Sequence, residues 1–387
     1  MLLSPPDDRA APDTLPAPVR RTAHAPQVAQ LLVVTDAWHP QVNGVVQTWT
    51  YMQRELAQLG VAARYVTPAG PSLPVPGEPG LRLTLRPGAQ LQRALQTLRG
   101  ELQSHEHFAL HIATEGPLGW AARRWARAQG LAFTTSYHTR FPEYFERRFG
   151  LPARLTYPTF RRFHAASSAV LVPTQRMVEA LAAQRFERVR LWPRGVDMAS
   201  FTPGERDALD REAGRALPRP IFLSVGRVAP EKNLEALLHL KLPGSVVVVG
   251  DGPALPSLRA RYPHALWLGA RRHDALAPLY RAADVFVFPS RTDTFGLVML
   301  EAMACGTPVA AFPVTGPIDV VEPGRTGVLD DDLGAACRSA LLLPRDAVRE
   351  AVLQRSWHAV AQTLLEALVP LRLDGLGEGG VLVEAGR

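Results

Sequence analysis

The chain has 387 residues, of which 47% are hydrophobic and 20% charged, so it is long enough for two domains that each bury a core. No apolar run approaches the roughly 18–20 residues that a membrane-spanning helix needs, and no membrane span is predicted. Two cysteines are too few for a disulfide framework or a zinc site, which favours the reducing cytosol, and the formal net charge of +7 is carried almost entirely by arginine.

The first half of the chain alternates short apolar runs with helical patterns. Residues 1–28 are rich in Pro and Ala, and we expect them to form a disordered extension. The strands predicted after it span residues 29–35, 62–67, 81–85, 108–112, 132–136 and 169–173. Continuous apolar runs are typical of buried parallel strands, and their alternation with helices predicts a doubly wound α/β sheet.

A turn-rich stretch at residues 188–203 interrupts this rhythm and predicts a linker. Strands are predicted again at residues 221–225, 245–249, 265–268, 285–289 and 308–312. We therefore expect two Rossmann-like domains, residues 29–195 and 196–345, that face each other across a cleft at the carboxyl ends of their strands. A helical segment, residues 346–371, could return to the first domain, and residues 372–387 are expected to form a flexible tail.

The segment 289–308 carries the most specific pattern in the chain. A predicted strand ends in a polar loop, and a glycine then starts a helix. The first-turn N–H groups, which have no intrahelical partners, belong to Gly296, Leu297 and Val298. Together with the helix dipole they suit a diphosphate. Asp293, in the loop, could hydrogen-bond sugar hydroxyls, and Glu301, more than one turn into the helix, could reach the ribose of the same nucleotide.

This segment resembles the acidic-x7-Glu signature of glycosyltransferase family 4, and the resemblance extends from Leu31 to about Leu368. The family is retaining and has the GT-B fold, in which two Rossmann-like doubly wound domains face each other across a cleft. Its members usually carry Glu at the first acidic position, where this sequence has Asp293. The resemblance implies an enzyme that transfers a hexosyl group from a nucleotide sugar.

Arg227 and Lys232 follow the first strand of the second half, at a glycine turn before a helix predicted to open at Pro230. By resemblance to the family, these cations neutralise the donor diphosphate and the charge on the leaving nucleotide. We therefore expect no metal, and no cofactor is expected because the nucleotide sugar is a substrate. The same resemblance places the nucleotide base near Gly250, Asp251 and Arg272, without identifying it.

In the first half, Gly44 and His138 each follow a predicted strand. Gly44 precedes the first helix, where a glycine lets a ligand approach the backbone closely. Its loop is not a GxGxxG fingerprint, which disfavours a dinucleotide cofactor. By resemblance, Gly44 contacts the donor phosphate and His138 lies near the donor sugar. The catalytic set implied by the family is His138, Arg227, Lys232 and Asp293.

Residues 120–164 contain nine arginines and two acidic residues, with aromatic side chains interleaved. Such a basic-aromatic belt suits an anionic membrane surface, at about 1 kcal/mol per well-placed cation. We expect a peripheral membrane enzyme with a lipid acceptor. The expected membrane or acceptor contacts are Arg140, Arg147, Arg148 and Phe149. The alternative is a solvated helical face whose aromatic residues are core. Nucleic acid is disfavoured, because no recognition module accompanies the charge.

The resemblance implies a retaining glycosyltransferase, and the composition and the basic-aromatic belt lead us to expect it in the cytoplasm, peripheral at the inner face of the cytoplasmic membrane. Its expected donor is a UDP- or GDP-sugar and its acceptor a lipid such as diacylglycerol, a phospholipid or a glycolipid. The sequence is similar to two narrower groups, the GDP-mannose-dependent α-mannosyltransferases and the synthases of glycosyl-diacylglycerol or sulfolipid. The alternatives on the same architecture are a UDP-sugar 2-epimerase and a catalytically silent sugar-nucleotide-binding protein. The oligomeric state is not predicted.

Overall fold

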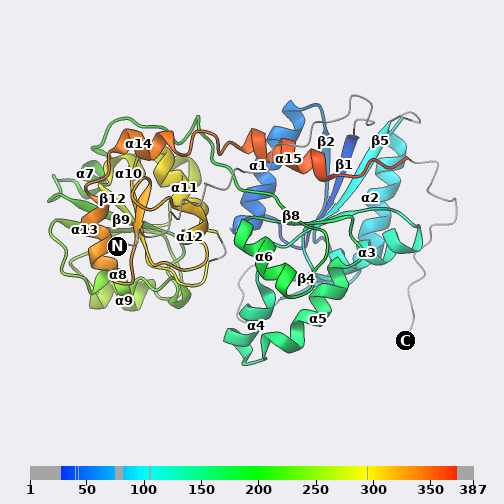
Figure 1. The fold of residues 1–387 in the computed structure, drawn as a ribbon, viewed down its shortest axis with the longest axis horizontal. Coiled ribbons are helices and arrows are strands. Elements are labelled where there is room, and N and C mark those ends of the chain that lie inside the picture. The colour runs from blue at the N-terminus through cyan, green and yellow to red at the C-terminus, as the bar shows by residue number, and fades with distance from the viewer. Residues whose placement is uncertain are drawn as a thin grey trace, which may run out of the picture.

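The computed structural model describes residues 28–39, 41, 43–74, 82–103, 106–293 and 295–372, apart from the side chains of residues 74, 82 and 147–149. The predicted N-terminal extension and C-terminal tail lie almost wholly outside the described residues. Figure 1 shows two α/β domains side by side, each built on a central sheet with helices packed against it. Within the described residues, no helix combines the length and the apolarity that crossing a bilayer requires.

The first domain carries a parallel sheet of six strands in the order β2-β1-β5-β6-β7-β8. Its elements are β1 (Val28–Val34), α1 (Gly44–Gln58), β2 (Ala62–Val66), β3 (Ser72–Pro74), β4 (Arg82–Thr84), α2 (Pro87–Glu101), β5 (His107–Ile112), α3 (Pro117–Ala128), β6 (Thr134–Ser136), α4 (Phe141–Phe149), α5 (Ala153–His164), β7 (Ala169–Val172), α6 (Gln175–Ala183) and β8 (Val189–Leu191). Successive strand residues point to opposite faces, so Val33 packs with Trp49 of α1, whereas Leu32 packs with Leu91 of α2. The two faces of the sheet are therefore covered by different helices.

The second domain repeats this plan with the strand order β11-β10-β9-β12-β13-β14. Its elements are α7 (Ala208–Ala213), β9 (Ile221–Val225), the 3-10 turn η1 (Pro230–Lys232), α8 (Glu235–Leu238), β10 (Ser245–Val249), α9 (Leu255–Arg261), β11 (Leu266–Gly269), the 3-10 turn η2 (His273–Ala275), α10 (Leu276–Ala282), β12 (Val285–Phe288), α11 (Leu297–Ala304), β13 (Val309–Ala311), α12 (Pro317–Val320), β14 (Gly327–Leu329), α13 (Leu333–Ala340), α14 (Arg345–Glu350) and α15 (Trp357–Ala367). The predicted pair of Rossmann-like, doubly wound domains is confirmed. Strand order reverses between β1 and β5 and between β9 and β12, which is where ligands bind in such sheets.

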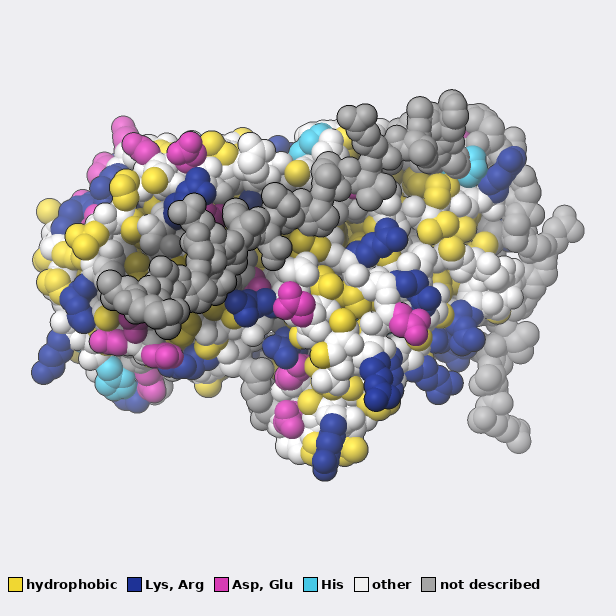
Figure 2. All heavy atoms as spheres, in the orientation of Figure 1, with side chains coloured by type: hydrophobic (Ala, Val, Ile, Leu, Met, Phe, Trp, Pro, Cys, Tyr) yellow, Lys and Arg dark blue, Asp and Glu magenta, His cyan; other side chains and the backbone are white. Residues whose placement is uncertain are grey.

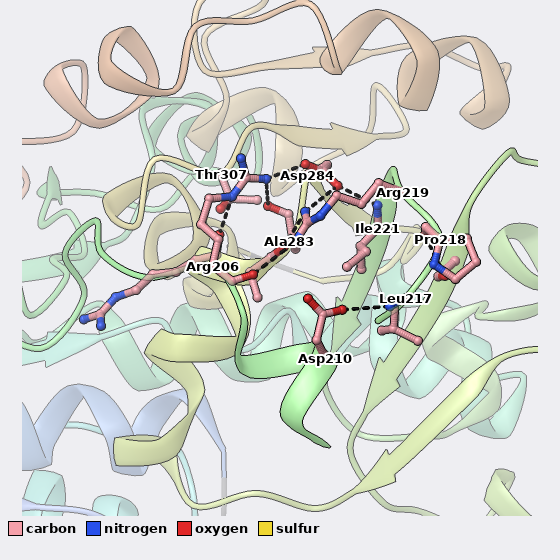
Figure 3. A network of polar contacts seen from close by, with 12 residues as sticks. Arg206, Asp210, Leu217, Pro218, Arg219, Ile221, Ala283, Asp284 and Thr307 are labelled. Atoms are coloured by element: carbon pink, nitrogen blue, oxygen red, sulfur yellow. Dashed lines mark hydrogen bonds and ion pairs between the residues drawn. The ribbon is translucent and has the colours of Figure 1, made fainter. Parts of the chain in front are cut away.

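A polar network joins the amino ends of β9 and β12 (Figure 3). Asp284, just before β12, accepts a hydrogen bond of 2.7 Å from the backbone N–H of Ile221 at the start of β9. The same carboxylate pairs with Arg206 and, at 3.0 Å, with Arg219. These contacts support the sheet at the edge opposite its carboxyl ends, so they position the site without touching it.

The C-terminal helices are divided between the domains. Val348 of α14 belongs to the core of the second domain. The helix α15, red in Figure 1, lies beside α1 of the first domain. There Trp357 stacks on Tyr51 of α1 with ring centroids 4.9 Å apart, and the indole N–H of Trp192 donates to the Val360 carbonyl at 3.0 Å. The segment 346–371 thus contributes to both domains and ties them together.

Three local predictions are wrong in whole or in part. The strand predicted at residues 81–85 is present as β4, but it pairs antiparallel with β3 and does not join the main sheet. The predicted linker at residues 188–203 contains β8, a three-residue edge strand whose partly exposed side chains give no continuous apolar run. The helix predicted at Pro230 is a single 3-10 turn, because Asn233 takes a left-handed backbone conformation (φ 53°) that ends it.

Candidate functional site

One cavity of about 430 Å³ lies between the domains, at the carboxyl ends of the strands. Both sheets contribute the loops that follow their strands, as expected at the points where strand order reverses. Eight residues singled out in the sequence line it: Gly44, His138, Arg227, Lys232, Asp293, Gly296, Leu297 and Val298. The structure therefore brings together side chains that are up to 254 positions apart, such as Gly44 and Val298.

The N-terminus of α11 opens into this cavity. Gly296 precedes the helix with a φ of 85°, and a Cβ at this position would lie 2.7 Å from the Met299 side chain. This left-handed backbone conformation favours glycine. The first-turn N–H groups that follow have no intrahelical partners and carry the positive end of the helix dipole, so they can bind a phosphate group.

Lys232 and Asp293 form an ion pair inside the cavity, with Nζ 2.5 Å from Oδ1. The pair is held by a short bridge between η1 and the loop after β12, in which the Asn233 side-chain amide donates to the Pro289 carbonyl at 3.0 Å. The second carboxylate oxygen of Asp293, Oδ2, is buried and has no hydrogen-bond partner within the described part of the chain. A buried acceptor of this kind can accept a hydrogen bond from a sugar hydroxyl.

Arg227 adds a second positive charge to the wall of the cavity. Its guanidinium is exposed, and the carboxylate of Glu231 lies 3.7 Å away, so the pair leaves most of its hydrogen-bonding capacity for a ligand. The candidate base residues Gly250, Asp251 and Arg272 do not line this cavity. Gly250 is needed for packing, because a Cβ there would lie 1.8 Å from the Gly226 carbonyl oxygen. Arg272 projects into solvent, 86% exposed, and pairs with Asp274.

Glu301 is not among the residues that line the cavity. Its carboxylate is only 4% exposed and accepts hydrogen bonds from Tyr280 (2.9 Å) and His273 (2.8 Å) of its own domain. It also accepts one from Gln47 of α1 (3.1 Å), and the Gln47 amide lies 2.7 Å from His273. An inter-domain contact therefore covers the group that the sequence assigns to the ribose.

Burial and the neighbouring carboxylates set the protonation of His273. Burial lowers the pKa of His273, but the hydrogen bond and charge of Glu301, with the charges of Asp197 and Asp274, outweigh it, so the pKa lies above its ordinary value. The protonated ring is consequently favoured beside the Glu301 carboxylate.

On the first-domain side, His138 is hydrogen-bonded to Arg194, with Nη2 3.0 Å from Nδ1. A guanidinium can only donate, so Nδ1 accepts and the ring carries its proton on Nε2. Burial and the charge of Arg194 hold the pKa of His138 well below its ordinary value, so the ring is neutral. It can therefore donate a hydrogen bond, but it is a poor general base.

Arg194 itself lines the cavity and was not identified as a site residue from the sequence. It is 5% exposed, donates to the Trp192 carbonyl at 2.8 Å and lies 4.6 Å from the Trp192 ring centroid. Burial lowers its pKa to about 9, which still leaves it charged at neutral pH. The sequence does show an arginine directly after Trp-Pro, but this arginine lies within the predicted linker, where no site residue is expected.

Hydrogen bonds within the first domain hold the loops that line the cavity in place. Asn43 caps α1 through hydrogen bonds of 3.0 Å from the backbone N–H groups of Val45 and Val46. Asp36, at the end of β1, accepts from the Leu118 N–H at 2.9 Å and so occupies the N-terminus of α3. At Gly44 no atom lies within 4 Å of the place that a Cβ would occupy, so this glycine keeps the space above α1 open to a ligand.

The basic-aromatic belt forms α3 to α5, and its described aromatic side chains pack on one another. Phe141 stacks on Phe160 with ring centroids 5.8 Å apart, and Phe145 lies against both. Arg140 does not line the cavity and pairs with Glu143. The side chains of residues 147–149, and with them the predicted contacts of Arg147, Arg148 and Phe149, lie outside the described residues.

Comparisons with known proteins agree across both domains. The model of Glycosyltransferase Family 4 matches residues 42–200, and that of Glycosyl transferases group 1 matches residues 219–342. A GDP-mannose-dependent alpha-mannosyltransferase of Mycobacterium tuberculosis is 33% identical, over 87% of this chain and 95% of its own. The sulfoquinovosyl transferase SQD2 of Arabidopsis thaliana is also 33% identical, over 57% of this chain and 46% of its own.

Two solved structures share the fold. A sucrose-phosphate synthase from Thermosynechococcus elongatus superposes with a TM-score of 0.70 at 21% identity, covering 87% of this chain and 97% of that one. HepE from Anabaena, in complex with UDP and glucose, superposes with a TM-score of 0.64 at 17% identity, covering 87% and 98%. Together with the family models and the full-length relative, these findings establish that the chain belongs to glycosyltransferase family 4 and is a GT-B glycosyltransferase that uses a nucleotide sugar.

Proposed function

We propose that this enzyme transfers a hexosyl group from a GDP- or UDP-sugar to a membrane lipid, with retention of anomeric configuration and without a metal ion. GDP-mannose is the first donor to test, because two mycobacterial relatives that cover 87% of this chain are named GDP-mannose-dependent alpha-mannosyltransferases. The observation that carries the proposal is one cavity in which Lys232, Asp293 and the N-terminus of α11 lie with His138.

In this proposal the donor diphosphate sits on the first turn of α11. The N–H groups there, Arg227 and Lys232 supply positive charge where negative charge develops as the nucleotide leaves. Fixed cations of this kind serve the purpose that a metal serves in other transferases. The unpartnered oxygen of Asp293 accepts a hydrogen bond from a hydroxyl of the donor sugar.

The transfer step needs no protein nucleophile. The bond between the anomeric carbon and the phosphate oxygen breaks, and the acceptor oxygen forms its bond to the same face of that carbon. The acceptor proton passes to the departing phosphate. Neutral His138, protonated on Nε2, suits a role as hydrogen-bond donor to the sugar and leaves proton removal to the phosphate. The protein then contributes position and charge.

A lipid acceptor is supported by the surface around α4 and α5. Figure 2 shows dark blue basic side chains beside yellow hydrophobic ones over this part of the first domain. Leu151 and Leu155 are exposed there, and Arg154 between them is exposed as well. Exposed leucines flanking a cation fit an anionic bilayer surface. Thr139 and Phe141, at the start of α4, line the cavity, so this surface adjoins the reaction site.

The test supplies GDP-mannose or UDP-glucose, each labelled with ¹³C at C1, to the enzyme with diacylglycerol-containing anionic vesicles and EDTA. We expect one donor to give a lipid-linked product whose C1–H1 coupling constant reports the α anomer. A β-linked product contradicts retention, and activity only after metal is added contradicts the metal-free mechanism. Transfer to a soluble sugar but to no lipid contradicts the acceptor class.

A further inference from the structure

A second cavity, of about 470 Å³, lies in the first domain between the C-terminal half of α5 and the loop that leads from α6 to β8. It shares no lining residue with the donor cavity. Arg161, Arg162 and Arg185 line it, and Glu187 is its only acidic lining residue among those described. The excess of positive charge points to an anionic ligand.

Two of these guanidinium groups have no protein partner within the described part of the chain, those of Arg162 and Arg185. Arg161 makes one hydrogen bond of 3.3 Å, to the Gln184 carbonyl. Glu187 points into solvent, 75% exposed, and its nearest cation is Arg188 at 3.6 Å. The arginines of the cavity are therefore not used by an ion pair that would explain their position.

The lining arginines are not needed as hydrogen-bond donors to the carbonyl groups at the end of α5 either. Arg123 donates to the Phe163 carbonyl at 2.8 Å, and Arg188 donates to the carbonyl of Ala165, the residue that caps the end of α5. These two arginines lie outside the cavity lining and already satisfy the negative end of the helix. The three lining arginines remain available to a ligand.

A buried histidine connects this cavity to the donor site. His164 lines the cavity although it is only 1% exposed, and its Nδ1 lies 2.9 Å from the Thr135 hydroxyl. Its Nε2 lies 3.2 Å from Glu115, and Glu115 lines the donor cavity. One side-chain pair thus touches both cavities, and its histidine can report on a ligand in the second.

We propose that the arginine-lined cavity is a phosphate site, separate from the donor site, that takes the headgroup phosphate of an anionic phospholipid. Arginine forks bind phosphate oxygens in pairs, and several of them around one cavity suit a phosphate ester. This inference does not depend on the identity of the sugar donor.

The exposed face of α5 favours a lipid as the source of the phosphate. Leu155, Pro158 and Arg162 follow one another at helical spacing, and Leu155 is exposed. Seven residues of helix separate Leu155 from Arg162, or about 10 Å. A phosphate bound at Arg162 therefore lies about 10 Å along the helix from Leu155, a distance that a phospholipid headgroup can span. The exposed Leu155 side chain can then enter the acyl region of the bilayer.

The test uses a variant that removes the two unpartnered charges, Arg162→Ala with Arg185→Asn. Asparagine suits position 185 because the backbone there is left-handed, with φ 61°. The matched control, Arg124→Ala with Arg127→Ala, removes two exposed charges from α3 outside both cavities. All proteins are compared first by thermal melting, so that a folding defect is recognised.

Histidine ring signals are followed by NMR while inorganic phosphate, and then glycerol phosphate, is added to labelled full-length protein. We expect a saturable shift of His164 in the wild type and in the control, at phosphate concentrations that differ from those that shift His138, because phosphate can also enter the donor cavity. The cavity variant should bind at least about tenfold more weakly. No shift at His164, or an equal response in the cavity variant, overturns the site.

Flotation with phosphatidylglycerol or phosphatidylcholine vesicles then distinguishes the two sources of phosphate. We expect retention on phosphatidylglycerol to fall several-fold further in the cavity variant than in the charge-matched control. Equal retention of the two variants, with phosphate binding still lost in one, overturns the lipid source and assigns the cavity to a soluble phosphate.

Discussion

Removing the ammonium group of Lys232 is the sharpest perturbation of the proposed donor site. Lys232 lies 2.5 Å from Asp293 and lines the cavity with the first turn of α11. A preorganised group that stabilises transition-state charge contributes about 2.7–4 kcal/mol, or about 100- to 1,000-fold in turnover. We therefore expect Lys232→Ala to lower turnover by that range. The free energy of unfolding should fall by about 1 kcal/mol, because the Lys232 and Asp293 side chains are both partly exposed.

The chain provides a matched control, because Lys232 and Lys241 are its only lysines. Lys241 is exposed in the loop before β10, and Lys241→Ala should leave turnover unchanged. The same pair permits a chemical test. Acetylation read by mass spectrometry should show that bound nucleotide protects Lys232 and leaves Lys241 reactive.

A double variant separates two roles of Lys232. If the lysine only neutralised Asp293, then Lys232→Ala with Asp293→Asn, which removes the charge but keeps an acceptor oxygen for the sugar hydroxyl, would recover turnover relative to Lys232→Ala alone. If it acts on the leaving diphosphate, the double variant is no faster. Turnover of Lys232→Ala within about threefold of wild type, or recovery in the double variant, would refute the reasoning.

Four further outcomes follow from the contacts described. Gln47→Ala should tighten nucleotide binding about two- to tenfold by calorimetry, because one covering hydrogen bond is removed; weaker binding would contradict this. The ion pair of His273 with Glu301 is kept at low pH and lost as pH rises through the raised pKa of His273, which frees Glu301 for the ribose; nucleotide affinity should therefore rise above about pH 6.5, and His273→Ala should abolish the trend. Arg194→Ala should raise the pKa of His138, seen by NMR titration, because a repelling charge is gone. Asp284→Ala should cost about 2 kcal/mol, or about 4–8 °C in Tm, with unchanged nucleotide affinity.

The parallel sheets were predictable because their strands are buried on both faces and appear as unbroken apolar runs, as in β10 and β12. The edge strands β8 and β14 are three residues long and partly exposed, so no such run marks them. The α11 motif was equally visible, because a strand, a polar loop, a glycine and a helix follow one another within a single stretch of chain.

The contacts that cross between segments could not be predicted. Arg194 contacts a histidine 56 positions earlier in the chain, and nothing local to either residue indicates the pair. Gln47 and Glu301 are 254 positions apart, and their hydrogen bond depends on how the two domains close on each other. Periodicity reports which face of an element is buried; it does not report which side chains meet across a cleft.

The central claim is that the cavity between the domains binds a nucleoside diphosphate sugar without a metal. It is tested most directly by calorimetric titration of GDP and UDP, in EDTA, into the wild type and into Lys232→Ala. We expect one nucleotide to bind the wild type at one site and to bind the variant about tenfold or more weakly. A folded wild type that binds neither nucleotide, or equal affinities in the two proteins, would contradict the account.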